Sequence, residues 1–383
     1  MNKFLVNVRY FVAPLMIILS LIGVVLGGPW VWTGVVLLGL AIILDTVITV
    51  QTPGAGRDEN GDALGIPALQ NNVMYGMLGI FVLVQLALAW RIFQYVNGVP
   101  YTPGGAELLG MTVANGITGW QLVGATMSTG IFAGIGIIYG HELAHTKGFS
   151  FVIARWMMGL SGSSHFCYAH VYNHHLELGC EDDPATSPRG RSLYAHFPLS
   201  YFGQSKFLYR MEQQRLARLN KPFITWENRW IRGYAMSLPS ILLFFYAGGW
   251  LGIICLLGVW TISNFELETL NYLEHYGLIR EKGGQIEYHH SWDNATALTS
   301  WFFIEIGRQA DHHDRGETHF WELDEVGAPN QGKGYFTEFA LALIPPVWHA
   351  LMRRELKKWD DEYASEGELE IANRINKQVG YAM

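Results

Sequence analysis

The chain has 383 residues, and only 15% of them are charged, against about 25% in ordinary soluble domains. Hydrophobic residues reach 50% and the formal net charge is −7, which excludes an intrinsically disordered chain, a typical soluble enzyme and a strongly basic nucleic-acid binder. The three cysteines form no close pair in the sequence, which excludes a disulfide scaffold and a Cys-x-x-Cys zinc or iron–sulfur site.

Six apolar stretches approach the roughly 20 residues that a helix needs to cross a bilayer. They run over residues 11–27, 31–50, 73–90, 116–139, 234–247 and 250–265. One such stretch alone is often a buried helix of a soluble protein, but six in a chain of low charge favour a membrane. The sequence therefore predicts an all-α polytopic membrane protein with about six transmembrane helices in three hairpins.

The placement of basic residues predicts the orientation in the membrane. Lys3 and Arg9 precede the first stretch, and no small-residue cleavage site follows it, which is typical of an uncleaved anchor. The loops after the first, third and fifth stretches contain no Lys or Arg, and Arg91 lies at the border of one of them. By the positive-inside rule, we expect a multi-pass protein of the inner (cytoplasmic) membrane with both termini in the cytoplasm.

This topology divides the chain into four segments. Residues 1–140 hold four transmembrane helices and residues 233–270 hold the last hairpin, while residues 141–232 and 271–383 are cytoplasmic and contain all fourteen histidines. A further apolar run over residues 339–352 contains two prolines, so we expect an interfacial or packed segment there. The run from residue 353 to about residue 378 is expected to be a charged, solvated helix.

The distribution of histidines needs an explanation, because eight of the fourteen histidines fall into four short clusters. Residues four apart share one face of a helix, so two such histidines can bind one ion. Adjacent histidines point about 100° apart on a helix, so one helix can serve two ions. The clusters are His141-Glu-Leu-Ala-His145, His170-Val-Tyr-Asn-His174-His175, Asn271-Tyr-Leu-Glu-His275-Tyr-Gly and Asp311-His312-His313. All four lie at the expected cytoplasmic ends of membrane helices.

Neutral imidazole suits iron, zinc, copper or nickel. A zinc site takes about three or four protein ligands, so eight histidines are too many for one ion and fit two. The predicted metal ligands are His141, His145, His170, His174, His175, His275, His312 and His313. We interpret the other histidines as packing or polar residues, although His165 and His290 lie close to the clusters. These others are His165, His196, His289, His290, His319 and His349.

Carboxylates are expected beside these ligands. Neutral ligands leave the charge of two divalent ions uncompensated near a membrane, and a carboxylate can bind the far N–H group of each ring. The candidates are Glu142, Glu266, Glu268, Glu274, Glu305 and Asp311. Ordinary surface charge is the alternative interpretation of each one.

These clusters resemble the integral-membrane alkane monooxygenase family, which includes the xylene monooxygenase hydroxylase component and belongs to the membrane fatty acid desaturase-like superfamily. The family pattern is a His-Glu-x-x-His box, a His-x-x-x-His-His box, an Asn-Tyr-x-Glu-His-Tyr-Gly-Leu stretch and an Asp-His-His box. Residues 141–145, 170–175, 271–278 and 311–313 match it, and residues 181–187 and 290–293 resemble further family segments. The similarity covers most of the chain.

The resemblance implies a non-haem di-iron centre, O₂ as co-substrate and hydroxylation of a methyl group of an n-alkane or alkyl-arene to a primary alcohol. The chain has Ala169, Asn173 and Gln309 where alkane members have Glu, Gly and a further His. A ninth ligand therefore stays open, with Gln309 or His290 as candidates. Ala169-His170-Val171 and the C-terminal part are more similar to the xylene branch, which favours an arene side chain.

Electrons must come from outside the chain. The sequence contains no Gly-x-Gly-x-x-Gly motif after a strand and no cysteine set for an iron–sulfur centre. We therefore expect a rubredoxin- or ferredoxin-type donor with its reductase to dock on the cytoplasmic face. The basic residues between Arg189 and Arg232 are candidates for contact with an acidic partner, although the positive-inside rule explains many of them.

Three other functions remain open. A lipid desaturase or fatty-acid hydroxylase also uses many histidines at a membrane, and product analysis separates it from a hydrocarbon hydroxylase. His141-Glu142-Leu-Ala-His145 matches the box of a zinc protease, but that reaction would leave most of the clustered histidines unused. A metal transporter predicts ionisable residues inside the spans, where only Asp45 clearly qualifies.

Overall fold

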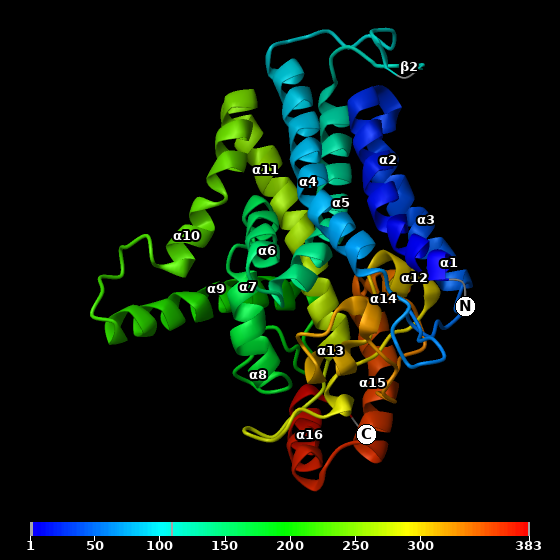
Figure 1. The fold of residues 1–383 in the computed structure, drawn as a ribbon, viewed down its shortest axis with the longest axis vertical. Helices are drawn as coiled ribbons and strands as arrows, with labels where there is room; N and C mark the ends of the chain where they lie inside the picture. Colours follow the sequence, from blue (N-terminus) through cyan, green and yellow to red (C-terminus); the bar gives the residue numbers. More distant parts are fainter. Residues whose placement is uncertain (1–2, 109, 382–383) are drawn as a thin grey trace.

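The computed structural model describes residues 3–108 and 110–381, and this part of the chain is almost wholly helical (Figure 1). The longer helices are α2 (Val12–Leu26), α3 (Thr33–Val47), α4 (Pro67–Val96), α5 (Gly119–Ala144), α6 (Phe149–Leu160), α9 (Leu193–Arg218), α11 (Leu238–His275), α15 (Pro345–Glu362) and α16 (Glu366–Val379). The shorter α-helices are α1 (Lys3–Val8), α7 (Phe166–Ala169), α8 (His175–Glu177), α10 (Arg229–Ala235), α12 (Ala297–Phe302), α13 (Gln309–Asp314) and α14 (Tyr335–Ala342).

Short 3-10 and π turns and one small pair of strands complete the fold. The 3-10 turns are η1 (Arg9–Phe11), η2 (Gly28–Trp32), η4 (Tyr288–His290) and η5 (Phe320–Glu322), and η3 (His170–His174) is a π turn. Strands β1 (Glu107–Leu108) and β2 (Met111–Thr112) pair antiparallel in the loop between α4 and α5. An all-α fold was predicted, and these two short strands are the only ones among the described residues.

Five segments of the described chain are long and apolar enough to cross a membrane. They are Lys3–Leu26, Gly28–Val47, Pro67–Val96, Gly119–Ala144 and Arg229–His275. Large apolar side chains on their outer faces are exposed, as on α3, where Val36, Leu40, Ile43 and Val47 follow one another at helical spacing. Such a surface suits lipid rather than water, so the chain is a membrane protein.

The last segment contains both of the last two predicted spans. Gly248 and Gly249 break the helical backbone of α11, and Gly249 has a φ of 55°, which favours glycine. The chain turns back at these residues, so the arms before and after them form a hairpin (Figure 1). The prediction of about six spans in three hairpins therefore differs from the five continuous segments only in how this hairpin is counted.

Helix α5 lies at the centre of the membrane bundle. It packs against α2, α3, α4, α6 and α11, and most of its residues from Leu122 onward are buried. The predicted span ended near Tyr139, but the helix continues without a break to Ala144. This continuation carries the first histidine cluster on the end of a membrane helix.

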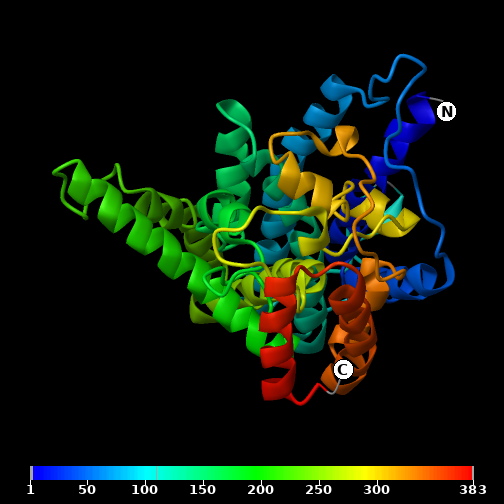
Figure 2. The same cartoon turned by 90° about the horizontal axis from the view of Figure 1, so that it is seen from below.

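The polar segments gather at one end of this bundle (Figure 1). Both described ends of the chain lie there, and from below α9 extends away from the bundle while α15 and α16 lie side by side (Figure 2). The predicted single C-terminal helix is in fact two helices, because Ser365 caps a new helix by accepting a hydrogen bond from the Glu368 N–H group. Trp348, Leu356 and Trp359 of α15 are fully buried, so this segment is packed rather than solvated.

Candidate metal centre

The first histidine cluster lies on the last turns of α5. His141 and His145 are four residues apart, and their ring centroids are 5.2 Å apart. The helix presents both rings toward the same neighbours, because residues at this spacing share a face. The sequence therefore predicted the geometry of this pair correctly.

The second cluster has a different geometry from the one that its spacing predicts. Residues 170–174 form a π turn, in which the N–H group of His175 donates to the carbonyl of His170, five residues earlier. This winding brings the ring of His175 closer to His170 than that of His174, with centroid distances of 4.7 and 5.1 Å, and the Nε2 atoms of His170 and His175 are 3.1 Å apart. Expected partners His170 and His174 instead belong to different groups. Single π turns inside helices are frequent at functional sites.

The third and fourth clusters bring their rings to the same place. His275 ends α11, while His312 and His313 lie on α13. The adjacent pair diverges as expected, since His312 faces the rings of α5 and His313 faces His275, with ring centroids 5.1 Å apart. Four elements that are distant in sequence thus bring all eight predicted histidines together.

Seven of the eight histidines form two groups. Within each group, the possible ligand atoms all lie within 4.8 Å of one another. The first histidine group is His141, His145, His170 and His312, and the second histidine group is His174, His275 and His313. His175 lies between them, with ring centroids 4.6 Å from His145 and 4.3 Å from His313. The arrangement therefore offers two neighbouring sites for metal ions.

Burial favours the neutral form, which binds metals, in several of these imidazoles. Burial, reinforced by the charge of neighbouring histidines, lowers the pKa of His170, His175 and His313 well below the ordinary value of 6.5. The same causes lower the pKa of His312 to about 4. At neutral pH these rings therefore have lone pairs available for an ion.

Several ring nitrogens lack any other partner. The Nε2 atoms of His141 and His170 face each other at 2.8 Å. Buried nitrogens without a hydrogen bond include Nε2 of His145 and His312 and both nitrogens of His275 and His313. Unsatisfied buried polar atoms are costly and rare, so these residues fit metal ions that would accept their lone pairs.

A carboxylate that the sequence analysis did not select orients one of these rings. Asp183 Oδ2 lies 2.7 Å from His174 Nδ1, and both side chains are almost fully buried. Burial opposes ionisation of this carboxyl, but the charge and hydrogen bond of His174 and the hydrogen bonds from Thr186 and the Ala185 N–H group outweigh it and lower its pKa to about 2. A carboxylate at this position fixes the tautomer and orientation of a ligating imidazole.

The signal for Asp183 was present in the sequence. Residues 181–187 resemble a family segment, but nothing local connects that loop with His174. The contact forms because the loop after α8 turns back, with Asp183 accepting the Ala185 N–H and Thr186 hydroxyl groups. Such a turn stabilises Asp183 in place.

The six acids that the sequence selected make other contacts. Glu142 accepts the Phe320 N–H group, and Glu268 accepts Gln204 and Asn271 amides. Glu305 is bound by Arg9, Tyr10 and Arg308, and Asp311 by Arg315. Glu274 lies beside Gln309 and Tyr335, and Glu266 faces a cavity between membrane helices. None of these six makes a hydrogen bond to a predicted ligand histidine among the described residues.

The two candidates for a ninth ligand lie in different surroundings. The Oε1 atom of Gln309 is buried next to Glu274 and has no hydrogen-bond partner. His290 instead donates from Nε2 to Glu368 Oε1 at 2.6 Å, because its Nδ1 atom already accepts the Glu287 N–H group. The ring of His290 therefore belongs to a separate cluster with His289 and Glu368.

Comparison with known proteins agrees with this geometry. The family model described as fatty acid desaturase matches residues 118–339. The chain is 29% identical to the xylene/toluene monooxygenase hydroxylase component XylM of Pseudomonas putida over 98% of this chain and 96% of that protein. It is 31% identical to alkane 1-monooxygenase 2 of Pseudomonas aeruginosa over 88% of this chain and 86% of that protein.

A third relative, alkane 1-monooxygenase of Acinetobacter baylyi, is 29% identical over 83% of this chain and 76% of that protein. The matches therefore include the membrane bundle as well as the four histidine clusters. The chain belongs to the fatty acid desaturase family and, within it, to the membrane monooxygenases that include the alkane 1-monooxygenases and the xylene monooxygenase hydroxylase component.

Proposed function

We propose that this chain is a di-iron monooxygenase that converts a methyl group of a hydrophobic hydrocarbon to a primary alcohol. The observation that carries the proposal is the pair of adjoining, largely buried histidine groups at the end of a membrane bundle. The names of the relatives, which are alkane 1-monooxygenases and a xylene/toluene monooxygenase component, support methyl hydroxylation over desaturation. Both an n-alkane and an alkyl-arene fit these names.

The first histidine group would hold one iron ion and the second histidine group the other. His175, between them, is close enough to both groups to serve either ion. When bound, the iron pair supplies the activation of O₂. The protein contributes the rigid, buried ligand set, and Asp183 holds His174 in the tautomer that presents Nε2.

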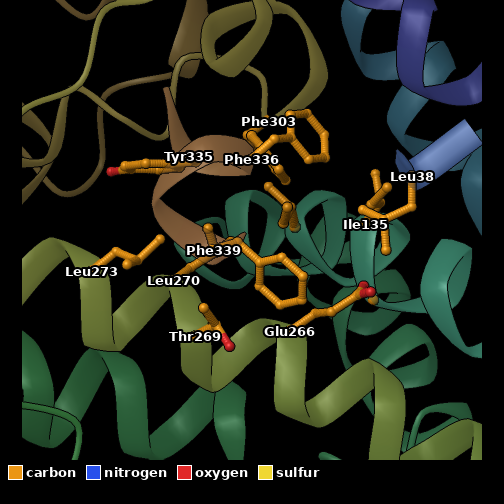
Figure 3. Close-up of a pocket in the computed structure, with 12 residues that line it drawn as sticks. Leu38, Ile135, Glu266, Thr269, Leu270, Leu273, Phe303, Tyr335, Phe336 and Phe339 are labelled. Carbon is orange, nitrogen blue, oxygen red and sulfur yellow. The ribbon is translucent and has the colours of Figure 1, made fainter. Parts of the chain in front are cut away.

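An apolar cavity between membrane helices, on the membrane side of the histidines, is the site that we propose for the hydrocarbon (Figure 3). Its walls come from α3, α5, α11 and α14, and Leu38, Ile135, Leu270 and Phe339 line it. The cavity extends to Ile138 and Leu273, which precede His141 and His275 by three and two residues. We define it as the membrane cavity. Its apolar walls would position a methyl group and exclude water.

The reaction needs two electrons from a second protein. One oxygen atom of O₂ enters the C–H bond to give the alcohol, and the other leaves as water after two electrons and two protons are added. The three cysteines of this chain are buried, free and far apart in sequence. We infer that an external rubredoxin- or ferredoxin-type carrier, supplied by a reductase, delivers the electrons.

An open cleft beside the second histidine group is the docking site that we favour for this carrier. Asp183, which is hydrogen-bonded to His174, and Gly277, two residues after His275, both line the cleft. Arg191 and Arg374 line it as well, whereas Arg189 is bound internally by Asp360. An acidic carrier in this cleft would lie one hydrogen bond from a ligand histidine.

The histidine end would face the cytoplasm of the inner membrane. The loops at the opposite end, residues 97–118 and the turns near residues 28 and 248, contain no Lys or Arg. The positive-inside rule therefore favours cytoplasmic termini and a cytoplasmic electron donor.

Product analysis with isotopically labelled O₂ tests the function. Membranes that contain the protein and a matched reductase system are supplied with an alkane, an alkylarene and an acyl lipid. We expect a primary alcohol of the alkane or alkylarene that carries one labelled oxygen atom. An unsaturated acyl chain without label would instead identify a lipid desaturase and contradict the proposal.

Substitution of one histidine supplies the control. His275→Ala should abolish turnover, because it removes a ligand of the second histidine group. His349→Ala should retain turnover, since His349 lies outside both groups and donates a hydrogen bond from Nε2 to the Arg191 carbonyl. Equal activity of the two variants would remove His275 from the centre.

A further inference from the structure

The membrane cavity contains a carboxyl group that a pure hydrocarbon does not use. Glu266, on the second arm of α11, lines the cavity among apolar side chains, and its Oε2 atom has no accessible surface and no hydrogen-bond partner. Figure 3 shows the carboxyl extended below Ile135, away from Thr269. A buried polar group without a partner is costly, and it is a candidate for an interaction with a ligand.

The neighbouring residues do not satisfy or neutralise this carboxyl. No Lys, Arg or His lines the membrane cavity. Thr269, which also lines it, donates its hydroxyl to the Phe265 carbonyl at 2.6 Å. Glu268, two residues along the same helix, differs because the Gln204 and Asn271 amides both bind it. Tyr335 also lines the cavity, but its hydroxyl points away from the other lining side chains (Figure 3) and lies beside Glu274. Glu266 therefore offers the open hydrogen-bonding capacity inside the cavity.

The backbone of α5 leaves room for the carboxyl. Residue 134 is glycine, and any Cβ atom at this position would collide with Glu266 Oε2. An ionised carboxylate without a cation is strongly unfavourable at membrane depth. The group therefore acts here as a neutral carboxylic acid, which can donate one hydrogen bond and accept others.

The distance to the histidines decides which part of a substrate Glu266 can reach. Glu266 precedes His275 by nine residues on one helix, which corresponds to about 13.5 Å at about 1.5 Å per residue. Gly134 precedes His141 by seven residues on α5, which corresponds to about 10 Å. A group bound at Glu266 is thus remote from the carbon that is oxidised.

We propose that Glu266 is a specificity-determining residue that binds the hydroxyl or carbonyl oxygen of a substrate whose far end presents a methyl group to the metal centre. The substrate class is then an extended, singly oxygenated hydrocarbon, such as a medium-chain primary alcohol, rather than a hydrocarbon alone. This inference rests on the proposed function, since it concerns the second end of the same substrate.

A comparison of decane with primary decanol tests the inference in the membrane preparation described above. The wild-type protein should convert decanol to the diol with hydroxyls at both ends, with a higher kcat/KM than it shows for decane. Glu266→Leu should lower the ratio of kcat/KM for decanol to kcat/KM for decane about tenfold, the effect of one lost buried hydrogen bond. Glu266→Gln should retain the preference, because an amide also donates and accepts.

The outcomes separate the two proposals. Wild-type protein that hydroxylates hydrocarbons but shows no preference for decanol overturns the inference and leaves the proposed function intact. Equal losses on both substrates in Glu266→Leu, or no loss on either, also overturn it, because they indicate a structural role or none. Absence of any hydroxylated product from wild-type protein overturns the proposed function and the inference with it. The wild-type comparison stands even where the leucine variant does not fold.

Discussion

At the scale of single residues, the centre depends on which ring nitrogens are free to bind an ion. The π turn at residues 170–174 moves the pairing by one residue, so that His170 and His175 meet while His174 turns to the second histidine group. Asp183 then fixes His174 through a hydrogen bond of 2.7 Å. The segment over residues 170–175 therefore contributes to both histidine groups, as its adjacent histidines allow. The spacing of these histidines in the sequence does not predict the π turn that arranges them.

Removal of the charge at Asp183 should weaken the second histidine group selectively. We expect Asp183→Asn to lower metal affinity about tenfold to hundredfold, because the imidazole of His174 loses its anionic partner. Chelator titration with metal analysis measures this, and the metal content should fall by about one ion per chain before the rest is lost.

The neighbouring residue offers a matched control for this substitution. Asp182 is exposed and pairs with exposed Lys282, so Asp182→Asn should behave like the wild-type protein. Identical metal loss in the two variants would mean that Asp183 does not orient a ligand.

At the scale of elements, one arginine joins the membrane helices at the end opposite the histidines. Arg91 of α4 is fully buried and donates to the carbonyls of Val24 and Val25 at the C-terminal end of α2 and to those of Ala114 and Gly116 in the loop before α5. A cation at a helix C-terminus also interacts favourably with the helix dipole. The contacts join α2, α4 and the segment between β2 and α5.

Arg91→Leu should therefore destabilise the bundle by about 3 kcal/mol or more, because it leaves several buried carbonyls without donors. Thermal unfolding in detergent measures this, and Arg91→Lys should be intermediate since it keeps the charge but loses the planar fork. Arg210→Leu, an exposed position on α9, is the control. Unchanged stability of Arg91→Leu would exclude this joining role.

A second element-scale contact predicts a pH dependence. Burial opposes ionisation of Glu368, but hydrogen bonds from His289 and His290 outweigh it and hold its pKa well below the ordinary 4.5. Burial lowers the pKa of His290 below 6.5. Both side chains bind protons more readily in the unfolded chain than in the folded one. Their contribution to the stability of the fold is therefore present at neutral pH and is lost as the pH falls. The loss begins at about pH 6.5 for His290 and at about pH 4.5 for Glu368.

We therefore expect α16 to detach first on acidification. Limited proteolysis of the C-terminal segment should be faster near pH 4 than at neutral pH. Glu368→Gln should be cleaved faster at neutral pH already, with a flatter pH profile, while Glu370→Gln, exposed on the same helix, should follow the wild-type protein. A profile of Glu368→Gln that matches the wild type would contradict this account.

At the scale of the whole molecule, local patterns predicted much of the architecture and of the site. Apolar runs identified the membrane helices, and the spacing of His141 and His145 predicted their shared face. The partners of the acids were not predictable, because Glu142 and Glu305 bind residues 178 and 295 positions away along the chain. The π turn and the role of Asp183 also depend on tertiary contacts that no local pattern encodes.

The central claim is that eight imidazoles hold two iron ions at one end of this bundle. Metal analysis of the purified membrane protein, combined with Mössbauer spectroscopy of iron-labelled samples, tests it most directly. We expect about two iron ions per chain, bound mainly by nitrogen ligands, and a lower iron content per chain in His275→Ala. A single zinc ion per chain, or iron content that His275→Ala leaves unchanged, would contradict it.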